Sequence, residues 1–218
     1  MTAFEAARTH MIDSQLRPNK VTDQRVLDAF ARIRRELFVP EHTRALAYVD
    51  EDLAVGRGRY LMEPMVAARL IQAAAPKPTE TALVVGAGTG YEAAVLSRLV
   101  RAVIAVEEYA EFARLAREAL VDEDIATVSV VEGKPREGHR ARAPYDVILF
   151  GGAITEVPSE ITAQLAEDGR LVGVVRSNSG VGRAILATKT GTVIARRVIF
   201  DASIPFLLGF EPKSVFAF

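Results

Sequence analysis

LVVGAGTGY, residues 83–91, places a short apolar run directly before three alternating glycines. The apolar run is typical of a buried strand, and Val95, Leu96 and Leu99 follow at helical spacing. Glycines at such a place permit a tight turn and let the backbone approach a bound molecule closely. We therefore expect a strand, a glycine turn and a helix, the unit with which many ligand-binding parallel sheets begin.

A second apolar run, residues 102–106, ends in Glu107, about 20 residues beyond the first glycine. An acidic side chain at the end of the second strand can accept hydrogen bonds from both hydroxyls of a ribose. The spacing G-x-G-x-G lacks the third glycine of G-x-G-x-x-G, which makes room beside a pyrophosphate. The pattern favours S-adenosylmethionine, which has no phosphates, over a nicotinamide dinucleotide. A tight turn that binds nothing is the remaining alternative.

Strand-like and helix-like segments alternate around this unit. Strands are expected at 82–85, 102–106, 127–131, 145–150 and 170–175, and helices at 91–100, 109–120 and 157–167. Such alternation implies a parallel sheet with both faces covered. Two further runs, 183–188 and 192–199, follow turn signals at 177–180 and 190–191, so the sheet should finish with antiparallel strands. The predicted fold class is α/β, a Rossmann-like sheet of seven strands.

The first 75 residues are predicted to form a helical cap. One helix should begin after Thr22-Asp23 and end before Pro40, and another should run from Pro64 to Ala75. Residues 50–60 between them are expected to be a loop. We expect residues 1–75 to be a substrate lid and residues 76–218 the sheet, packed together as one compact domain.

Composition excludes several classes of protein. The chain has no cysteine, and its three histidines are scattered, so neither a disulfide framework nor a metal site is expected. A net charge of −1 gives no field that would attract nucleic acid. Because no apolar run reaches membrane-spanning length and the N-terminus lacks a signal-peptide pattern, the sequence predicts a cytoplasmic protein without a membrane partner.

Several short motifs lie between residues 22 and 176. They are RELFVP at 35–40, AYVD at 47–50 followed by GRG at 56–58, GTGYEAAVL at 88–96, APYD at 143–146 and GRLV at 169–172. Together they resemble the motifs of the protein-L-isoaspartate O-methyltransferase family. The resemblance implies a seven-stranded methyltransferase sheet, S-adenosylmethionine as cofactor, and protein or peptide substrates that contain isoaspartyl residues. Members of that family esterify the stray α-carboxylate of such residues and so begin the repair of damaged proteins.

Three positions depart from the family pattern. Family members carry Q-T-I-S-x-P before the second helix, whereas this chain has RYLMEP at 59–64, with Met62 in place of the serine. The family's G-D-G after the third strand is GKP here, so Lys134 replaces an acid that accepts from the adenine amino group. Val84 stands where an acid usually precedes the glycines. Lysine has no acceptor in its side chain, and we expect a weaker contact with adenine.

The resemblance and the glycine pattern together assign candidate site residues. Cofactor-binding residues are expected at Gly86, Ala87, Gly88, Thr89, Gly90, Tyr91, Glu107, Gly133, Lys134 and Gly151. The candidates near the reacting carboxylate are Met62, Arg59 and Arg57, the two arginines because guanidinium suits carboxylate recognition. Met62 can equally pack in the core, and the arginines can equally belong to a solvated loop. Gly151 and Gly152, after the fourth strand, are expected to leave room for the reacting centre.

The predicted function is that of a carboxyl O-methyltransferase that acts on isoaspartyl residues. A carboxylate is already ionised at neutral pH and needs no general base. The alternative is a relative that keeps the fold and the cofactor pocket but methylates another acceptor or does not catalyse.

Overall fold

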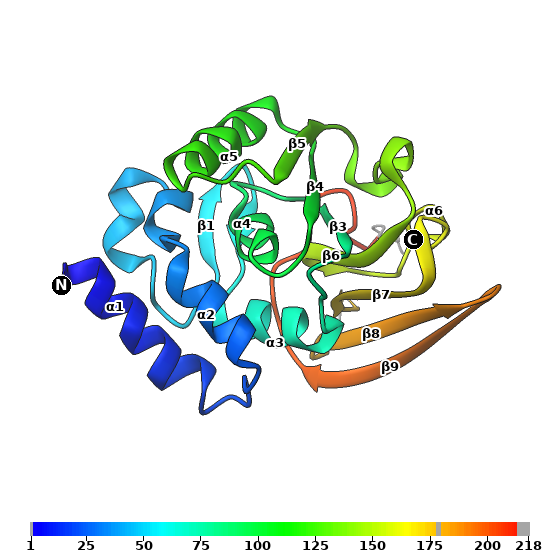
Figure 1. Ribbon diagram of the computed structural model, residues 1–218, viewed down its shortest axis with the longest axis horizontal. Helices are drawn as coiled ribbons and strands as arrows, with labels where there is room; N and C mark the ends of the chain where they lie inside the picture. The colour runs from blue at the N-terminus through cyan, green and yellow to red at the C-terminus, as the bar shows by residue number, and fades with distance from the viewer. Residues whose placement is uncertain (1, 178–179, 213–218) are drawn as a thin grey trace, which may run out of the picture.

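Seven strands form one twisted sheet in the computed structural model, which describes residues 2–177 and 180–212 (Figure 1). Their order across the sheet is β5-β4-β3-β6-β7-β8-β9. The bounds are β3 (Thr81–Val85), β4 (Ala102–Glu107), β5 (Val128–Glu132), β6 (Tyr145–Ile154), β7 (Leu165–Val175), β8 (Arg183–Thr190) and β9 (Val193–Asp201). Strands β3 to β7 pair with one another in parallel, and β8 is antiparallel to both β7 and β9. The predicted fold class is confirmed.

Both faces of the sheet are covered, which explains why its central strands are apolar throughout. Alternate residues of β3, such as Ala82 and Val84, share one core with α3 (Pro64–Ala74), α4 (Tyr91–Ser97) and α5 (Ala110–Asp122). The residues between them point into a second core, which contains Leu207 and Phe210 from the C-terminal segment. This second face is therefore covered in part by an extended segment, beside Ile161 of the short helix α6 (Ser159–Thr162).

The expected helix at 157–167 is wrong. Only α6 (Ser159–Thr162) is helical there, and β7 already begins at Leu165. The backbone N–H of Tyr145 donates to the carbonyl of Gln164 at 2.8 Å, and Leu165 pairs with Tyr145 of β6. Pairing with β6 thus makes Leu165 and the residues after it a strand, although their local propensity predicted a helix. Asn178 and Ser179, part of the turn predicted before β8, lie outside the described residues.

The N-terminal part consists of short helical segments around one small hairpin. It contains α1 (Ala3–Met11), a π-helical turn (Ile12–Leu16), α2 (Gln24–Arg32), and 3-10 turns at Arg35–Phe38 and Glu41–Leu46. The predicted loop at 50–60 is wrong, because it folds into an antiparallel pair, β1 (Leu53–Gly56) and β2 (Arg59–Leu61). Positive φ angles at Gly56, Arg57 and Gly58 make the turn between them.

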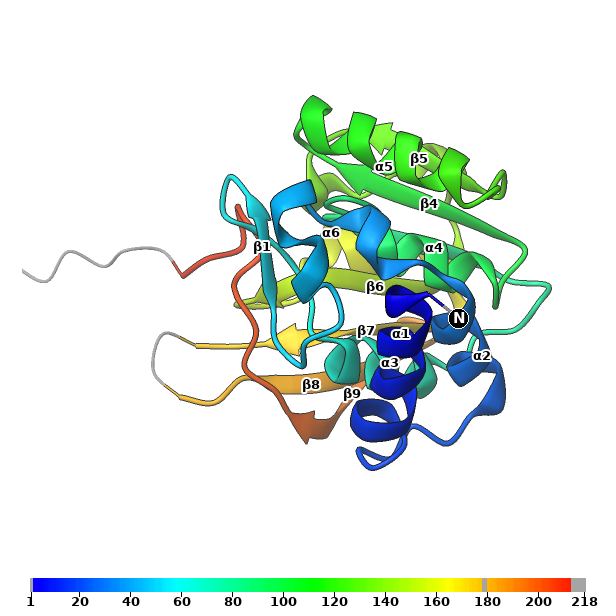
Figure 2. The same ribbon diagram turned by 90° about the vertical axis from the view of Figure 1, so that its left-hand side faces the viewer.

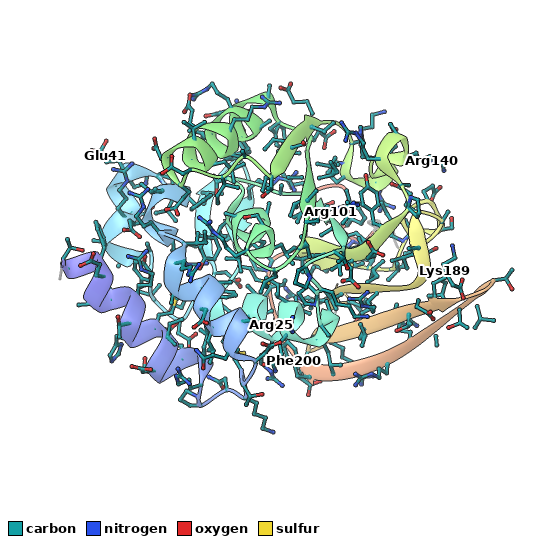
Figure 3. The ribbon with its side chains drawn as sticks, in the orientation of Figure 1. Arg25, Glu41, Arg101, Arg140, Lys189 and Phe200 are labelled. Atoms are coloured by element: carbon teal, nitrogen blue, oxygen red, sulfur yellow. The ribbon has the colours of Figure 1, made fainter. Side chains whose placement is uncertain are left out.

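Helix α3 connects the N-terminal part to the sheet, as predicted from its proline start. The guanidinium of Arg69 in α3 lies 3.8 Å from the ring centroid of Phe200 in β9. Phe200 is labelled in Figure 3. Arg25 of α2, also labelled there, donates to the carbonyl of Pro76 at 3.1 Å. The boundary at residue 75 remains a prediction. Within residues 2–177 and 180–212, no helix is long and apolar enough to cross a membrane.

Candidate active site

The carboxyl ends of β3, β4 and β6 meet where the strand order reverses direction, the usual ligand site of such sheets. The glycine turn stands at this edge. Gly86, Gly88 and Gly90 have φ angles of 74°, 53° and 96°, which side chains with a Cβ rarely adopt. The N–H groups of Gly86 and Ala87 donate to the carbonyl of Val106 at 2.9 Å, so the turn is fastened to β4. The predicted strand–turn–helix unit is present.

Glu107 ends β4 with its carboxylate against the glycine turn, at the place the sequence predicted. Its Oε2 accepts from the N–H of Gly88 at 2.8 Å. Its Oε1 accepts from the N–H groups of Glu108 at 2.9 Å and Tyr109 at 3.1 Å. The residue is completely buried. The carboxylate that was expected to receive ribose hydroxyls is thus surrounded by hydrogen-bond donors of its own chain.

Arg59 supplies the fourth donor to this carboxylate. Its Nη2 lies 2.8 Å from Oε1 of Glu107, and its side chain is 3% exposed. Side chains alternate along β2, so Arg59 and Leu61 point inward while Tyr60, at 41% exposure, points outward. Nε and Nη1 of Arg59 are buried and have no partner among the described residues. The structure therefore places Arg59 on Glu107 and not in a solvated loop, and its contact with a substrate carboxylate remains a prediction.

Residues 204–210, which we name the C-terminal strap, cross the same edge of the sheet. In Figure 2 the segment coloured red leaves the end of β9 and runs beside the β1–β2 hairpin. The side chain of Leu207 fills the space above Gly86, where even an added Cβ would overlap it. Gly152 is also close to the strap, because a Cβ there would lie 3.0 Å from the backbone nitrogen of Leu207.

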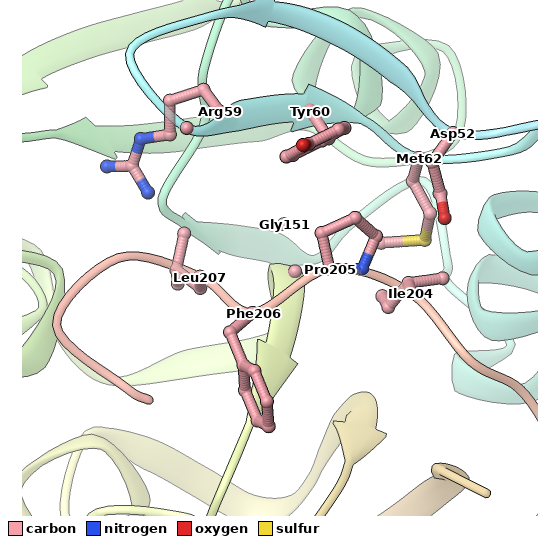
Figure 4. Close-up of a pocket in the computed structure, with 11 residues that line it drawn as sticks. Asp52, Arg59, Tyr60, Met62, Gly151, Ile204, Pro205, Phe206 and Leu207 are labelled. Atoms are coloured by element: carbon pink, nitrogen blue, oxygen red, sulfur yellow. The ribbon is translucent and has the colours of Figure 1, made fainter. Parts of the chain in front are cut away.

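The cavity that remains between hairpin and strap is about 10 Å³. Figure 4 shows residues of the hairpin on one side of it and residues of the strap on the other. It is lined by Asp52, Gly58, Arg59, Tyr60, Met62, Gly151, Gly152, Ile204, Pro205, Phe206 and Leu207. Sites for small molecules usually enclose about 300–1,000 Å³. An adenosyl cofactor does not fit these residues in this conformation.

The room expected at Gly151 is taken by the chain itself. A Cβ on Gly151 would overlap the carbonyl oxygen of Gly86, so the two backbones are in direct contact. Glycine is required here for the close approach of β6 to the glycine turn, and its small size leaves no open space. The expectation that Gly151 and Gly152 leave room for a reacting centre is wrong for this conformation.

Two residues of the glycine motif point away from the pocket. Thr89 Oγ1 donates to the carbonyl of Phe38 at 2.6 Å, which ties the turn to the N-terminal part. The ring of Tyr91 is buried between Phe30 and Phe38, with centroid distances of 6.0 and 5.5 Å. Burial raises the pKa of Tyr91 to about 12. Both side chains thus join the glycine motif to the N-terminal part, and their contact with the cofactor remains a prediction.

The remaining candidates are distributed around the edge of the site. Lys134 is exposed and lies 3.6 Å from Glu137, while the N–H of Gly133 donates to the carbonyl of Glu107 at 3.0 Å. Arg57 is exposed at the hairpin turn and lies 3.0 Å from Glu111. Met62 is 2% exposed, belongs to the main core and also lines the small cavity. Met62 therefore packs in the core, and its place beside a reacting carboxylate remains a prediction.

The sequence reasoning missed a buried arginine that supports Met62. Arg35 is completely buried, and it donates to the carbonyls of Ala47 and Met62 at 2.7 Å each. Its guanidinium also lies 4.7 Å from the ring centroid of Tyr91. The only signal was its place in the RELFVP motif, because burial of an arginine cannot be read from spacing.

An acidic group beside the hairpin was also missed. Asp52 Oδ1 accepts from the N–H of Glu63 at 2.9 Å. Burial, together with the neighbouring carboxylates of Asp52 and Asp50, raises the pKa of Glu63 to about 7. Burial also raises the pKa of Asp52. The hairpin brings these acids together, since Asp52 precedes β1 and Glu63 follows β2, and they lie next to the RYLMEP segment that departs from the family motif.

A seven-stranded sheet, a glycine turn after its first strand and an acid at the end of the next define the class of Rossmann-like methyltransferases. A model of the family "Protein-L-isoaspartate(D-aspartate) O-methyltransferase (PCMT)" matches residues 6–199. The protein-L-isoaspartate O-methyltransferase of Koribacter versatilis is 41% identical over 172 residues, which are 79% of this chain and 78% of that one. The chain belongs to the protein-L-isoaspartate O-methyltransferase family.

Solved structures agree with this assignment. One protein-L-isoaspartate O-methyltransferase is 25% identical and superposes with a TM-score of 0.79, covering 91% of this chain and 65% of that chain. A Plasmodium falciparum structure, described as a putative member in complex with S-adenosyl-L-homocysteine, gives a TM-score of 0.74 at 18% identity. It covers 95% of this chain and 99% of its own, and at that identity it shows the fold alone.

Proposed function

We propose that this methyltransferase transfers a methyl group to the free carboxylate of isoaspartyl residues in damaged proteins, in the cytoplasm. The family match over residues 6–199 carries this proposal. The cofactor of the family is S-adenosylmethionine, which supplies an electrophilic methyl group. The S-adenosyl-L-homocysteine bound in the Plasmodium falciparum neighbour, which is what S-adenosylmethionine becomes after methyl transfer, is in keeping with that cofactor.

Methyl transfer to a carboxylate mainly requires that the protein hold the two reactants in the right orientation. A carboxylate has a pKa of about 4, so at neutral pH the acceptor is already a nucleophile and needs no general base. Orienting two reactants can contribute about 7–11 kcal/mol to lowering a barrier. The residues available for orienting a peptide are those of the β1–β2 hairpin, because the hairpin forms one wall of the small cavity.

Arg57 is the better candidate for the substrate carboxylate. Arg59 is committed to Glu107, whereas the Arg57 side chain is 62% exposed and its one ion pair, with Glu111, is at the surface. Surface pairs contribute only about 0–1 kcal/mol, so an incoming carboxylate can replace Glu111. Met62 supplies an apolar wall where the family has a serine, and Tyr60 offers an exposed ring for the peptide backbone.

The test is an isoaspartyl peptide, its aspartyl counterpart and labelled S-adenosylmethionine, with base-labile methanol release as the readout. We expect release from the isoaspartyl peptide alone. Equal release from both peptides would show a different acceptor. Arg57→Gln should raise KM for the peptide while Arg117→Gln, at an exposed pair with Glu132, should not.

A further inference from the structure

The cofactor side of the site is closed by two contacts that are separate in sequence. Arg59 occupies the carboxylate of Glu107, and Leu207 occupies the space above Gly86. The glycine turn and the acid are the two features that define the class, yet each one is covered by the chain itself. The motif predicts an accessible cofactor pocket, whereas Arg59 and Leu207 cover both of its defining features.

Backbone hydrogen bonds hold the middle of the strap on the sheet. The N–H of Ala153 donates to the carbonyl of Pro205, and the N–H of Leu207 donates to the carbonyl of Ala153, both at 2.8 Å. These bonds make Phe206 a parallel bridge partner of Ala153, at the end of β6. The strap therefore pairs with the carboxyl end of β6 as a short added strand. It lies directly over the place where a ligand would enter.

Two arginines hold the ends of the strap. Arg176, after β7, donates from Nη1 to the carbonyl of Ile204 at 3.1 Å, and its guanidinium lies 5.2 Å from the ring centroid of Phe206. Arg136, after β5, donates from Nε to the carbonyl of Gly209 and lies 4.6 Å from the ring centroid of Phe210. Both arginines contact the strap through a hydrogen bond and a ring, so they stabilise its closed position.

The strap is not one of the seven paired strands, and beyond a single bridge it has no regular secondary structure, so its departure would leave the pairing of the sheet intact. Departure would expose the buried side chains of Ile204, Leu207 and Phe210 and break the backbone hydrogen bonds at Ala153 and Thr155. The open state therefore costs free energy and is the minor one, as in other local openings of native proteins. Arg59 is also poorly satisfied where it is, because two of its three nitrogens have no partner among the described residues.

We propose that the C-terminal strap and Arg59 form an autoinhibitory closure of the cofactor pocket. S-adenosylmethionine then binds only to molecules in which Leu207 has left Gly86 and Arg59 has left Glu107. The proposal rests on the proposed function in its choice of cofactor. Its consequence is an apparent affinity that is reduced by the fraction of molecules in the open state.

The test uses S-adenosylhomocysteine and the full chain. Calorimetry compares the wild type with Leu207→Ala, which removes the side chain above Gly86, and with Leu208→Ala as the matched control. Leu208 belongs to the same strap, but its side chain lies against Gly58 and not against the glycine turn. If the open fraction is about 1–10%, Leu207→Ala should bind about 10- to 100-fold more tightly, with Leu208→Ala near wild type.

Hydrogen–deuterium exchange provides a second readout on the wild type alone. Adding S-adenosylhomocysteine should speed exchange at the amides of Ala153 and Leu207, because both lose their partners when the strap leaves. A pocket that is open in solution would instead slow exchange or leave it unchanged. Arg59→Leu should also tighten binding, whereas Arg114→Leu, at an exposed pair with Glu118 that leaves Glu107 paired, should not.

The outcomes separate this proposal from the function. Equal, tight binding by wild type and Leu207→Ala, without faster exchange in the strap, would overturn the closure and leave the methyltransferase function standing. No binding by any variant, together with no methylation of the isoaspartyl peptide, would overturn both. Tighter binding by Leu207→Ala with no methylation would support the closure and reject the isoaspartyl acceptor.

Discussion

Arg59 Nη2 and Glu107 Oε1 are 2.8 Å apart, and the two side chains are 3% and 0% exposed. The pair joins the β1–β2 hairpin to the end of β4, across a distance of 48 residues in sequence. A buried ion pair of this kind repays its desolvation only with good geometry and further hydrogen bonds, and here only the carboxylate has them. The pair thus favours one conformation of the site at the cost of an incompletely satisfied guanidinium.

Removing one partner of this pair should destabilise the protein. Glu107→Ala leaves the Arg59 guanidinium buried without a counter-ion, which typically costs about 3–5 kcal/mol. The double variant Arg59→Met/Glu107→Gln should recover most of the loss, because no charge then remains buried. Urea unfolding of the single and double variants measures both effects. The exposed pair offers a matched control: Arg57→Met/Glu111→Gln should change stability by at most about 1 kcal/mol. Equal losses in both pairs would contradict the burial argument.

Glu63 should make stability depend on pH. Its pKa is about 7 in the folded protein against an ordinary 4.5, so the folded chain binds more protons between these values. Stability from this group is therefore highest near pH 4.5, falls as pH rises to about 7 and is constant above. Because Glu63 is only half-buried, Glu63→Gln should gain about 1 kcal/mol over wild type at pH 8 and nothing near pH 4.5. Thermal unfolding at both pH values measures this difference. Glu51→Gln, at an exposed neighbour, should show no such dependence.

Met62→Ser should have opposite effects on rate and stability. A buried methionine replaced by a small residue leaves a cavity that costs about 2–4 kcal/mol. Serine restores the hydroxyl donor of the family motif, so the methylation rate on an isoaspartyl peptide should rise, by about ten- to a hundredfold if a donor is what the wild type lacks. Met62→Ala creates a similar cavity without the hydroxyl and should not share the gain. A brisk wild-type rate that falls in the serine variant would show a differently built carboxylate site.

Lys134→Asp should tighten binding of S-adenosylhomocysteine. An aspartate at this exposed position adds an acceptor for the adenine amino group, and one such hydrogen bond contributes about 1 kcal/mol, near fivefold in affinity. The comparison is best made in the Leu207→Ala background, where the strap does not compete. Lys134→Ser is the control for loss of the lysine charge. Unchanged affinity for the aspartate variant would mean that backbone or water already serves the adenine.

The sequence by itself determined the sheet and the position of the acid. Apolar runs bounded by turn residues locate all seven strands, and burial on both faces makes the central strands β3, β4 and β6 apolar throughout. The position of Glu107 is predictable from the same local pattern, because it is the polar residue that ends a buried apolar run next to the glycine turn. The hairpin at 53–61 and the true start of β7 at Leu165 were not predictable in this way, since pairing with other segments overrides local propensity there.

Only the tertiary structure decided what surrounds that acid. Arg59 looks like a loop cation in the sequence, and Leu207 belongs to a segment without recognisable motif, yet both lie on the cofactor edge. Their positions depend on how the hairpin and the C-terminal strap pack against the carboxyl ends of β3, β4 and β6. Burial and ion pairing at long separation follow from that packing, and no local pattern of residues encodes which cation reaches which carboxylate.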